Sequence, residues 1–186
     1  MTTSSIHVLG ISGSLRQGSY NTGLLYAAAD LAPDGMRLEI FDLSPIPLFN
    51  QDLELDLPEP VHRLKAHIAA ADALLFAVPE YNYSFSGVLK NAIDWASRPP
   101  RDMPLSGKPA AILGAGGRYG TVRAQLHFRQ VAAHLNLLVL NRPELMVPYA
   151  SEKFSPDGRL TDEQTREQLK SLLDALAAWT RRLRGL

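Results

Sequence analysis

The sequence predicts an α/β fold: a doubly wound, five-stranded parallel sheet with helices on both faces, which makes three layers. Two observations carry this prediction. Five short apolar runs alternate along the chain with five longer stretches of helical character, and parallel strands require right-handed crossovers that place helices on the sheet faces. The 186 residues are expected to form one domain over 1–186, because a chain of this length buries roughly 70% of its unfolded surface.

The five short apolar runs are the expected strands. Four are almost continuously apolar, as strands covered on both faces are, and the second alternates in polarity with a period of two. Pro79 ends the third run and stiffens the turn that follows. The expected strands are 6–11, 36–43, 73–79, 109–115 and 136–141.

Helix boundaries follow from capping and breaking residues. The first helix begins near Tyr20 and is stopped by Pro33 and Gly35. The last begins with Thr161 and Gln164 in capping-box spacing. It continues with leucines at amphipathic spacing, namely Leu169, Leu172, Leu173, Leu176 and Leu183. The other expected helices are 61–72, the second half of 81–98, and about 121–134, while 44–60, with four prolines, is a connecting loop.

Composition excludes several classes of function. Nineteen basic residues offset nineteen acidic ones, so we expect no nucleic-acid partner, whose binding would need excess positive charge. The chain has no cysteine, which excludes disulfides, thiolate catalysis and cysteine-bound metal clusters and fits a reducing compartment. No signal peptide and no apolar run near the roughly 20 residues of a membrane helix is seen. The sequence therefore predicts a cytoplasmic protein without a membrane partner.

The turn after the first strand has the composition of a phosphate site. The segment 10–22 offers hydroxyls at Ser12, Ser14 and Ser19, a guanidinium at Arg16, and a helix start near Tyr20. Backbone N–H groups at a helix start, hydroxyl donors and a cation together bind a phosphate dianion. The plain alternative is a solvated turn that precedes a helix.

The spacing of the glycines narrows the kind of phosphate. Gly13 and Gly18 match a nucleotide-triphosphate loop, but Ser19 stands where that motif requires lysine. With Gly10, these glycines also miss the spacing that accommodates the pyrophosphate of a dinucleotide. A terminal phosphomonoester fits this turn better.

Two later turns, which leave the same edge of the expected sheet, are suited to a flat ring. Glu80 and Asn82 offer polar groups beside the faces of Tyr81 and Tyr83, a mixture that suits a planar heteroaromatic ligand. Glycines in 114–120 allow backbone N–H groups to approach such a ring closely. The alternatives are that Tyr81 and Tyr83 cap the core or a subunit contact, and that the glycine-rich segment is only a flexible turn.

No metal site is expected from the five histidines. His62 and His67 diverge on a helix because they are five positions apart. His127 and His134 align but lie roughly 10 Å apart along a helix axis, too far to share an ion. A metal-dependent hydrolase is therefore a weak alternative.

Several motifs resemble the NADPH-dependent FMN reductase family of flavodoxin-like proteins, which includes bacterial quinone, chromate and azo reductases. They are GSLRQGSYN, PEYNYS followed by LKNAIDW, and the later blocks KPAAILGAGG, RAQLHFRQV and NRPE. The resemblance covers nearly the whole chain. It implies a sheet in the order 2-1-3-4-5 and FMN held without a covalent bond.

By position, the resemblance implies three groups of FMN contacts. Around the phosphate and ribityl chain it places Ser12, Ser14, Arg16, Ser19, Tyr20 and Asn21. Along the isoalloxazine it places Pro79, Glu80, Tyr81 and Asn82, and on its other side the backbone of Gly114, Ala115, Gly116 and Gly117. Close relatives often carry Thr or Ser at the first three of these last positions, so only main-chain donors are expected there.

The resemblance also implies an activity and an assembly. Hydride would pass from NADPH or NADH to FMN and then to a quinone, azo compound, metal oxyanion or free flavin, with ping-pong kinetics and no catalytic side chain. Family members are usually homodimers or homotetramers, and Tyr83, Arg123 and Glu144 would join such an interface. Arg118 and Tyr119 would shape the nicotinamide or acceptor pocket.

One alternative is a flavodoxin-type electron carrier that does not oxidise NAD(P)H. Such carriers are typically strongly acidic and have threonine-rich phosphate loops. The zero net charge and Arg16 argue against a carrier.

Overall fold

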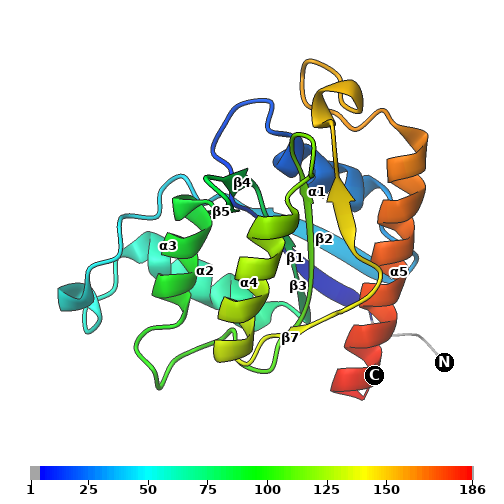
Figure 1. Ribbon diagram of the computed structural model, residues 1–186. Coiled ribbons are helices and arrows are strands. Elements are labelled where there is room, and N and C mark those ends of the chain that lie inside the picture. The colour runs from blue at the N-terminus through cyan, green and yellow to red at the C-terminus, as the bar shows by residue number, and fades with distance from the viewer. Residues whose placement is uncertain (1–4, 186) are drawn as a thin grey trace.

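A parallel sheet lies between two layers of helices in the computed structural model, which describes residues 5–185 (Figure 1). Its order is β2-β1-β3-β6-β7, with β8 also paired to β6, and every pair is parallel. The predicted class and the order 2-1-3-4-5 are therefore confirmed. The strands are β1 (Ile6–Ser12), β2 (Met36–Phe41), β3 (Ala73–Ala77), β6 (Pro109–Ala115), β7 (Leu138–Val139) and β8 (Leu145–Val147).

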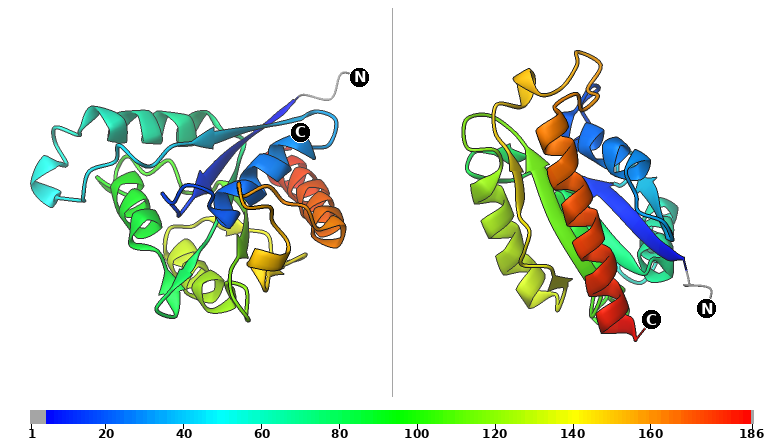
Figure 2. Two further views of the ribbon diagram at one scale, coloured as in Figure 1. Left: turned by 90° about the horizontal axis from the view of Figure 1, so that it is seen from above. Right: turned by 90° about the vertical axis from the view of Figure 1, so that its right-hand side faces the viewer.

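Helices cover both faces of the sheet (Figure 2). They are α1 (Tyr20–Asp30), α2 (Glu59–Ala70), α3 (Gly87–Ala96), α4 (Val122–His134) and α5 (Glu163–Arg184). Two short 3-10 turns, η1 (Gln51–Leu53) and η2 (Ala150–Glu152), complete the helical elements of the described residues. Within 5–185, no helix is both long enough and apolar enough to cross a membrane.

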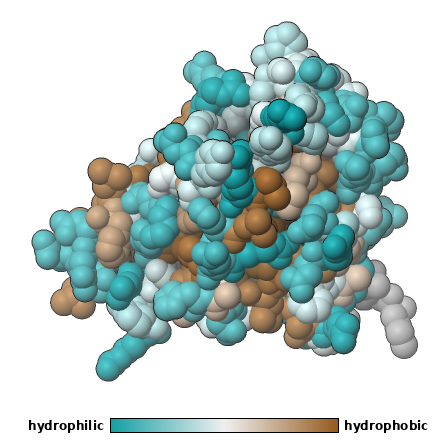
Figure 3. Space-filling view, in the orientation of Figure 1, coloured by the Kyte–Doolittle hydropathy of each residue, from teal (hydrophilic) through white to brown (hydrophobic). Residues whose placement is uncertain are grey.

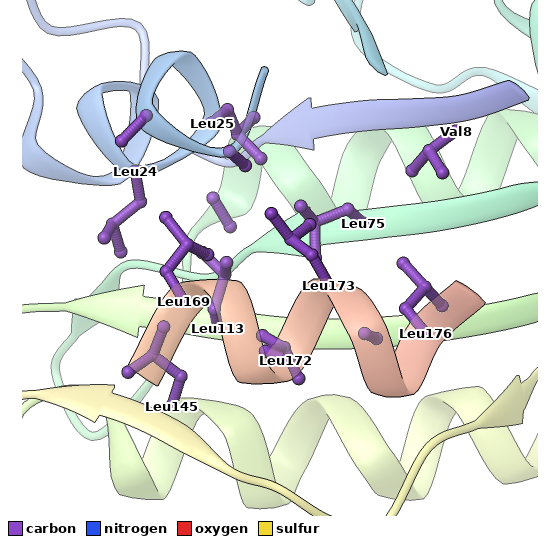
Figure 4. Close-up of a cluster of buried hydrophobic side chains, with 14 of the residues drawn as sticks. Val8, Leu24, Leu25, Leu75, Leu113, Leu145, Leu169, Leu172, Leu173 and Leu176 are labelled. Carbon is purple, nitrogen blue, oxygen red and sulfur yellow. The ribbon is translucent and has the colours of Figure 1, made fainter. Parts of the chain in front are cut away.

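Each face of the sheet has its own apolar core. On one face, the leucines of α1 and α5 pack over Val8, Leu75 and Leu113 of the strands (Figure 4). On the other face, α2, α3 and α4 pack around Phe76 and Phe128, whose ring centroids lie 4.8 Å apart. Both faces of β1, β3 and β6 are thus covered, which explains why these strands are continuously apolar in sequence.

The prediction for the fifth strand is wrong in part. Of 136–141, only the two residues of β7 pair with β6, next to Pro109 and Ala110. The edge resumes as β8, which pairs with β6 from Leu113 to Ala115 and was not predicted. Pro143, which has no N–H to donate to the sheet, lies in the interruption.

The expected start of the last helix is also wrong, by one residue. The N-cap is Asp162, whose carboxylate accepts a hydrogen bond from the backbone N–H of Thr165 at 2.9 Å. Thr161 is instead bound to the carbonyl of Lys153, to which its N–H and its hydroxyl both donate. Of the five leucines assigned to the apolar stripe, Leu183 is partly exposed, at 38%.

The proline-rich connection before α2 is a loop, as predicted, and is held in place by α3. The Asn91 side chain accepts a hydrogen bond from the N–H of Phe49 at 2.7 Å and donates to the carbonyl of Pro47 at 2.8 Å. The indole of Trp95, fully buried, donates to the same carbonyl at 2.8 Å. These bonds connect the loop, whose only regular element is η1, to the core.

We expect Asn91→Ala to lower the free energy of unfolding by about 1–3 kcal/mol, because it leaves the N–H of Phe49 without its partner and removes one of the two hydrogen bonds to the carbonyl of Pro47. Chemical denaturation measures the loss, and limited proteolysis should show faster cleavage within 42–58. Lys90→Ala is the matched control, since Lys90 makes only an exposed ion pair with Asp94 and its removal should cost less than about 0.5 kcal/mol. Equal losses in the two variants would contradict this role.

Candidate active site

The carboxyl ends of β1, β3 and β6 meet at one edge of the sheet, where ligands of doubly wound folds bind. A pocket of about 480 Å³ opens there between the turns that follow the three strands. The side chains at this upper end of the molecule are mostly hydrophilic (Figure 3). Eleven of the fourteen predicted positions line the pocket: Ser14, Arg16, Ser19, Tyr20, Asn21, Pro79, Glu80, Tyr81, Ala115, Gly116 and Gly117.

The start of α1 forms the polar wall of the pocket. Ser19 is the N-cap, and its hydroxyl oxygen accepts a hydrogen bond from the N–H of Thr22 at 3.4 Å. The guanidinium of Arg16 is exposed and lies 5.0 Å from the ring centroid of Tyr20. The first backbone N–H groups of a helix have no partner within the helix and carry its partial positive charge. This wall is suited to a dianion.

Two of the predicted residues serve the structure of this wall. The Ser12 hydroxyl is buried and lies 2.8 Å from the hydroxyl of Thr22. The Asn21 amide donates to the carbonyl of Ala115 at 2.9 Å and accepts from its N–H at 3.1 Å. Ser12 therefore does not reach the pocket, and the side chain of Asn21 joins α1 to the end of β6.

The glycine-rich turn divides into packing and lining positions. Gly114 does not line the pocket, and a Cβ there would overlap the hydroxyl oxygen of Thr121 and the carbonyl oxygen of Val78. The N–H of Gly116 donates to the carbonyl of Val147 at 3.0 Å. The N–H of Ala115 is bound to Asn21. Of the four backbone N–H groups expected to meet the ring, that of Gly117 therefore remains. A Cβ at Gly117 would meet nothing within 4 Å.

The turn after β3 is a short antiparallel hairpin, β4 (Glu80–Tyr81) and β5 (Ser84–Phe85), which was not predicted. Asn82 and Tyr83 form its tip in the left-handed region, with φ of 49° and 68°. Both side chains are exposed and neither lines the pocket. Asn82 is therefore the third predicted position outside it.

Glu80 points toward α4. Its carboxylate accepts hydrogen bonds from the backbone N–H groups of Arg123 and Ala124 at 3.1 and 3.3 Å, and from the Arg123 Nε at 2.6 Å. The guanidinium of Arg123 lies 3.8 Å from the ring centroid of Tyr83 and 5.1 Å from that of Tyr119. The hydrogen bond that Arg123 donates to Glu80 raises the pKa of Arg123 above its ordinary value. Glu80 thus caps α4 and fixes a cation between two tyrosines.

The segment after β8 forms a wall that the sequence interpretation missed. Tyr149, Ala150 and Ser151 line the pocket, and Tyr149 is left-handed with φ of 50°. The N–H of Tyr149 donates to the carbonyl of Gly117 at 3.0 Å, and that of Ala150 to the carbonyl of Gly116 at 2.9 Å. The apolar LMV of β8 was the signal that could have revealed this wall.

The other residues that the resemblance assigned to the interface or to the substrate pocket differ in where they lie. Arg118, Tyr119 and Arg123 line the pocket. Glu144 is exposed and makes no ion pair among residues 5–185. No group of three or more histidine, aspartate or glutamate residues in the described part of the chain is placed to hold a metal ion.

The doubly wound sheet and this pocket define the class of protein: flavodoxin-like, with a site at the carboxyl edge that suits an anionic, flat ligand. A family model, NADPH-dependent FMN reductase, matches residues 6–152. The chain belongs to this family. It is therefore an NAD(P)H-dependent oxidoreductase whose cofactor is FMN, as predicted, and the comparisons give the electron-carrier alternative no support.

Relatives match over nearly the whole chain. An NAD(P)H-dependent FMN reductase of Pseudomonas aeruginosa is 58% identical, covering 97% of this chain and 98% of that protein. An NAD(P)H:quinone oxidoreductase of Solanum tuberosum is 47% identical, with 97% and 95% covered. Among solved structures, the flavoenzyme NAD(P)H:(acceptor) oxidoreductase FerB of Paracoccus denitrificans has a TM-score of 0.87 at 36% identity and covers 95% of this chain and 98% of that one.

Proposed function

We propose that the protein reduces quinones with NADPH or NADH by way of FMN bound in the pocket at the carboxyl edge. The observation that carries the proposal is that one pocket contains a helix start, two hydroxyls and a guanidinium without an ion pair among residues 5–185, and is also lined by glycines. Relatives named for quinone reduction, such as the 2-hydroxy-1,4-benzoquinone reductase of Burkholderia sp, 41% identical, support the choice of acceptor.

The donor set of the pocket fits FMN in three parts. Ser14, Ser19, Arg16 and the start of α1 would hold the phosphate, since they supply hydroxyl, cationic and backbone donors. Pro79 and Tyr81 on one side, and the open position at Gly117 on the other, would border the ring. When bound, FMN supplies a nitrogen, N5, that accepts and releases hydride.

The chain's own contribution is positioning and electrostatics. Three arginines and one glutamate line the pocket, so its lining is positively charged. This charge favours anionic ligands. No general acid or base is required of the protein for hydride transfer, which fits a pocket whose one lining carboxylate, Glu80, is bound to Arg123.

A direct test follows the flavin absorbance of the purified, FMN-loaded protein under anaerobic conditions. NADPH or NADH should bleach the flavin, and a benzoquinone should restore its colour. Initial rates at several fixed quinone concentrations should give the parallel double-reciprocal lines of ping-pong kinetics. If neither nucleotide bleaches the flavin while dithionite does, the enzyme assignment is wrong and the chain is a carrier.

We further propose that the protein acts in the cytoplasm as a homodimer or homotetramer. The absence of cysteine supports a reducing compartment. The exposed faces of Tyr83, with its stacked Arg123, and of Leu126 on α4 support an assembly that covers this side. Sedimentation at several protein concentrations measures the assembly state.

A further inference from the structure

The three arginines of the pocket differ in what holds them. Arg123 is bound by the carboxylate of Glu80. Neither Arg16 nor Arg118 makes an ion pair with any carboxylate of residues 5–185. Both are exposed and line the pocket, so both are available to anionic groups of a ligand.

The two available arginines belong to different parts of the pocket. Arg16 follows β1 and Arg118 follows β6, and β3 lies between these strands in the sheet. Neighbouring strands are about 4.8 Å apart, so the ends of β1 and β6 are separated by about 10 Å. Turns that leave the sheet this far apart have room for two different anionic groups. If Arg16 serves the FMN phosphate, Arg118 remains for a phosphate of the second substrate.

The orientation of Arg118 is supported by a chain of stacked groups. Its guanidinium lies 5.4 Å from the ring centroid of Tyr119, and the guanidinium of Arg123 lies 5.1 Å from the same ring. Arg123 is in turn fixed by Glu80 at the start of α4. A guanidinium over an aromatic face keeps its edge N–H groups free, and these match the oxygens of a phosphate.

The chemistry of the lining also indicates which phosphate. In dinucleotide sites of Rossmann folds, a carboxylate binds the ribose 2′-hydroxyl of NADH, and an arginine accommodates the 2′-phosphate of NADPH. The same pairing of charges applies to a nucleotide bound at this pocket. Glu80 is the carboxylate that lines the pocket, and both its oxygens are occupied by Arg123 and Ala124. The described lining therefore offers a free arginine and no free carboxylate.

We propose that Arg118 binds the 2′-phosphate of NADPH and makes the protein prefer NADPH to NADH. This inference rests on the function proposed above, and it adds the residue that distinguishes the two nucleotides. Because Arg118 acts on a group remote from the nicotinamide, it determines KM and leaves hydride transfer at saturation unchanged.

The experiment compares wild type, Arg118→Ala, Arg118→Lys and the control Arg182→Ala, an exposed arginine near the end of α5. In Arg118→Ala, KM for NADPH should rise about 10–100-fold, the range expected for a lost charged hydrogen bond. The KM for NADH, both kcat values and the FMN affinity should stay within about twofold. Arg118→Lys should recover part of the NADPH preference, and Arg182→Ala should match wild type.

Calorimetry with NADP+ and NAD+ gives a second readout that does not depend on turnover. Arg118→Ala should lose NADP+ affinity by the same factor and keep its NAD+ affinity. Equal weakening of both nucleotides would overturn the assignment to the 2′-phosphate, as would a wild-type protein without NADPH preference. In either case both nucleotides would still bleach the flavin, so these failures are distinct from a failure of the proposed function.

Discussion

Replacing Arg16 and Ser19 together by alanine is expected to weaken FMN binding about 100- to 1000-fold. A charged hydrogen bond to phosphate contributes about 1.5–3 kcal/mol and a neutral one about 1 kcal/mol, and each 1.4 kcal/mol is a factor of ten. Both residues line the pocket at the start of α1, and Arg16 makes no ion pair within residues 5–185 that would compete with a ligand. Flavin fluorescence titration of the apoprotein measures the affinity.

Two controls separate the phosphate from the fold. Riboflavin lacks the phosphate, so its affinity should be nearly the same in the variant and the parent. Ser19 is the N-cap of α1, and its removal should also lower the free energy of unfolding by about 1 kcal/mol. Arg37→Ala, an exposed arginine on β2, should leave FMN affinity unchanged. An unaltered FMN affinity in the double variant would place the phosphate elsewhere.

The second large effect is expected at Gly114, where alanine should destabilise the fold by about 3 kcal/mol, the upper range for overpacking. The added Cβ would overlap the hydroxyl oxygen of Thr121 and the carbonyl oxygen of Val78. Thr121 is fully buried and its hydroxyl accepts a hydrogen bond from the Gln125 amide at 3.0 Å, so it cannot turn away without losing this bond. Urea denaturation measures the loss.

Gly117→Ala is the matched control in the same turn. A Cβ at Gly117 meets nothing within 4 Å, so the free energy of unfolding should change by less than about 0.5 kcal/mol. The new methyl group would instead border the pocket that Gly117 lines and should weaken FMN binding. Equal losses of unfolding free energy in the two variants would contradict the claim that Gly114 is packed more tightly than Gly117.

The parts of the fold that the sequence predicted well are those with a strong local signal. β1 and β6 have seven residues each and are buried throughout. Their sequences are therefore almost continuously apolar, and this pattern alone predicts them. β8 has three residues and the hairpin strands have two each, which is too short for a period to be recognised. The start of α5 was misplaced because two adjacent residues, Thr161 and Asp162, are both good caps and tertiary contacts decide between them.

In the candidate site, too, the features with a local sequence signal were predicted and those that depend on distant residues were not. The serines, glycines and arginine after β1 lie in one short segment, and composition was enough to predict an anion site there. The role of Glu80 depends on Arg123, which is 43 positions away, and that of Asn21 on Ala115, which is 94 positions away. No local pattern encodes such pairs. Sequence reasoning therefore identified the turns after β1, β3 and β6 as parts of the pocket, but it missed the segment after β8. It also did not show which side chains in these turns are bound by the protein itself.

The double hydrogen bond between Asn21 and Ala115 has a consequence for redesign of this enzyme. It connects the base of the 116–120 turn to α1, the helix whose start forms the proposed phosphate site. Mutagenesis libraries confined to 117–119 would then vary the side chains that contact NADPH or NADH. The position of α1 and of the proposed FMN phosphate site would stay unchanged. Libraries that extend back to Ala115 or Asn21 would change both at once, and altered nucleotide choice could no longer be separated from loss of flavin.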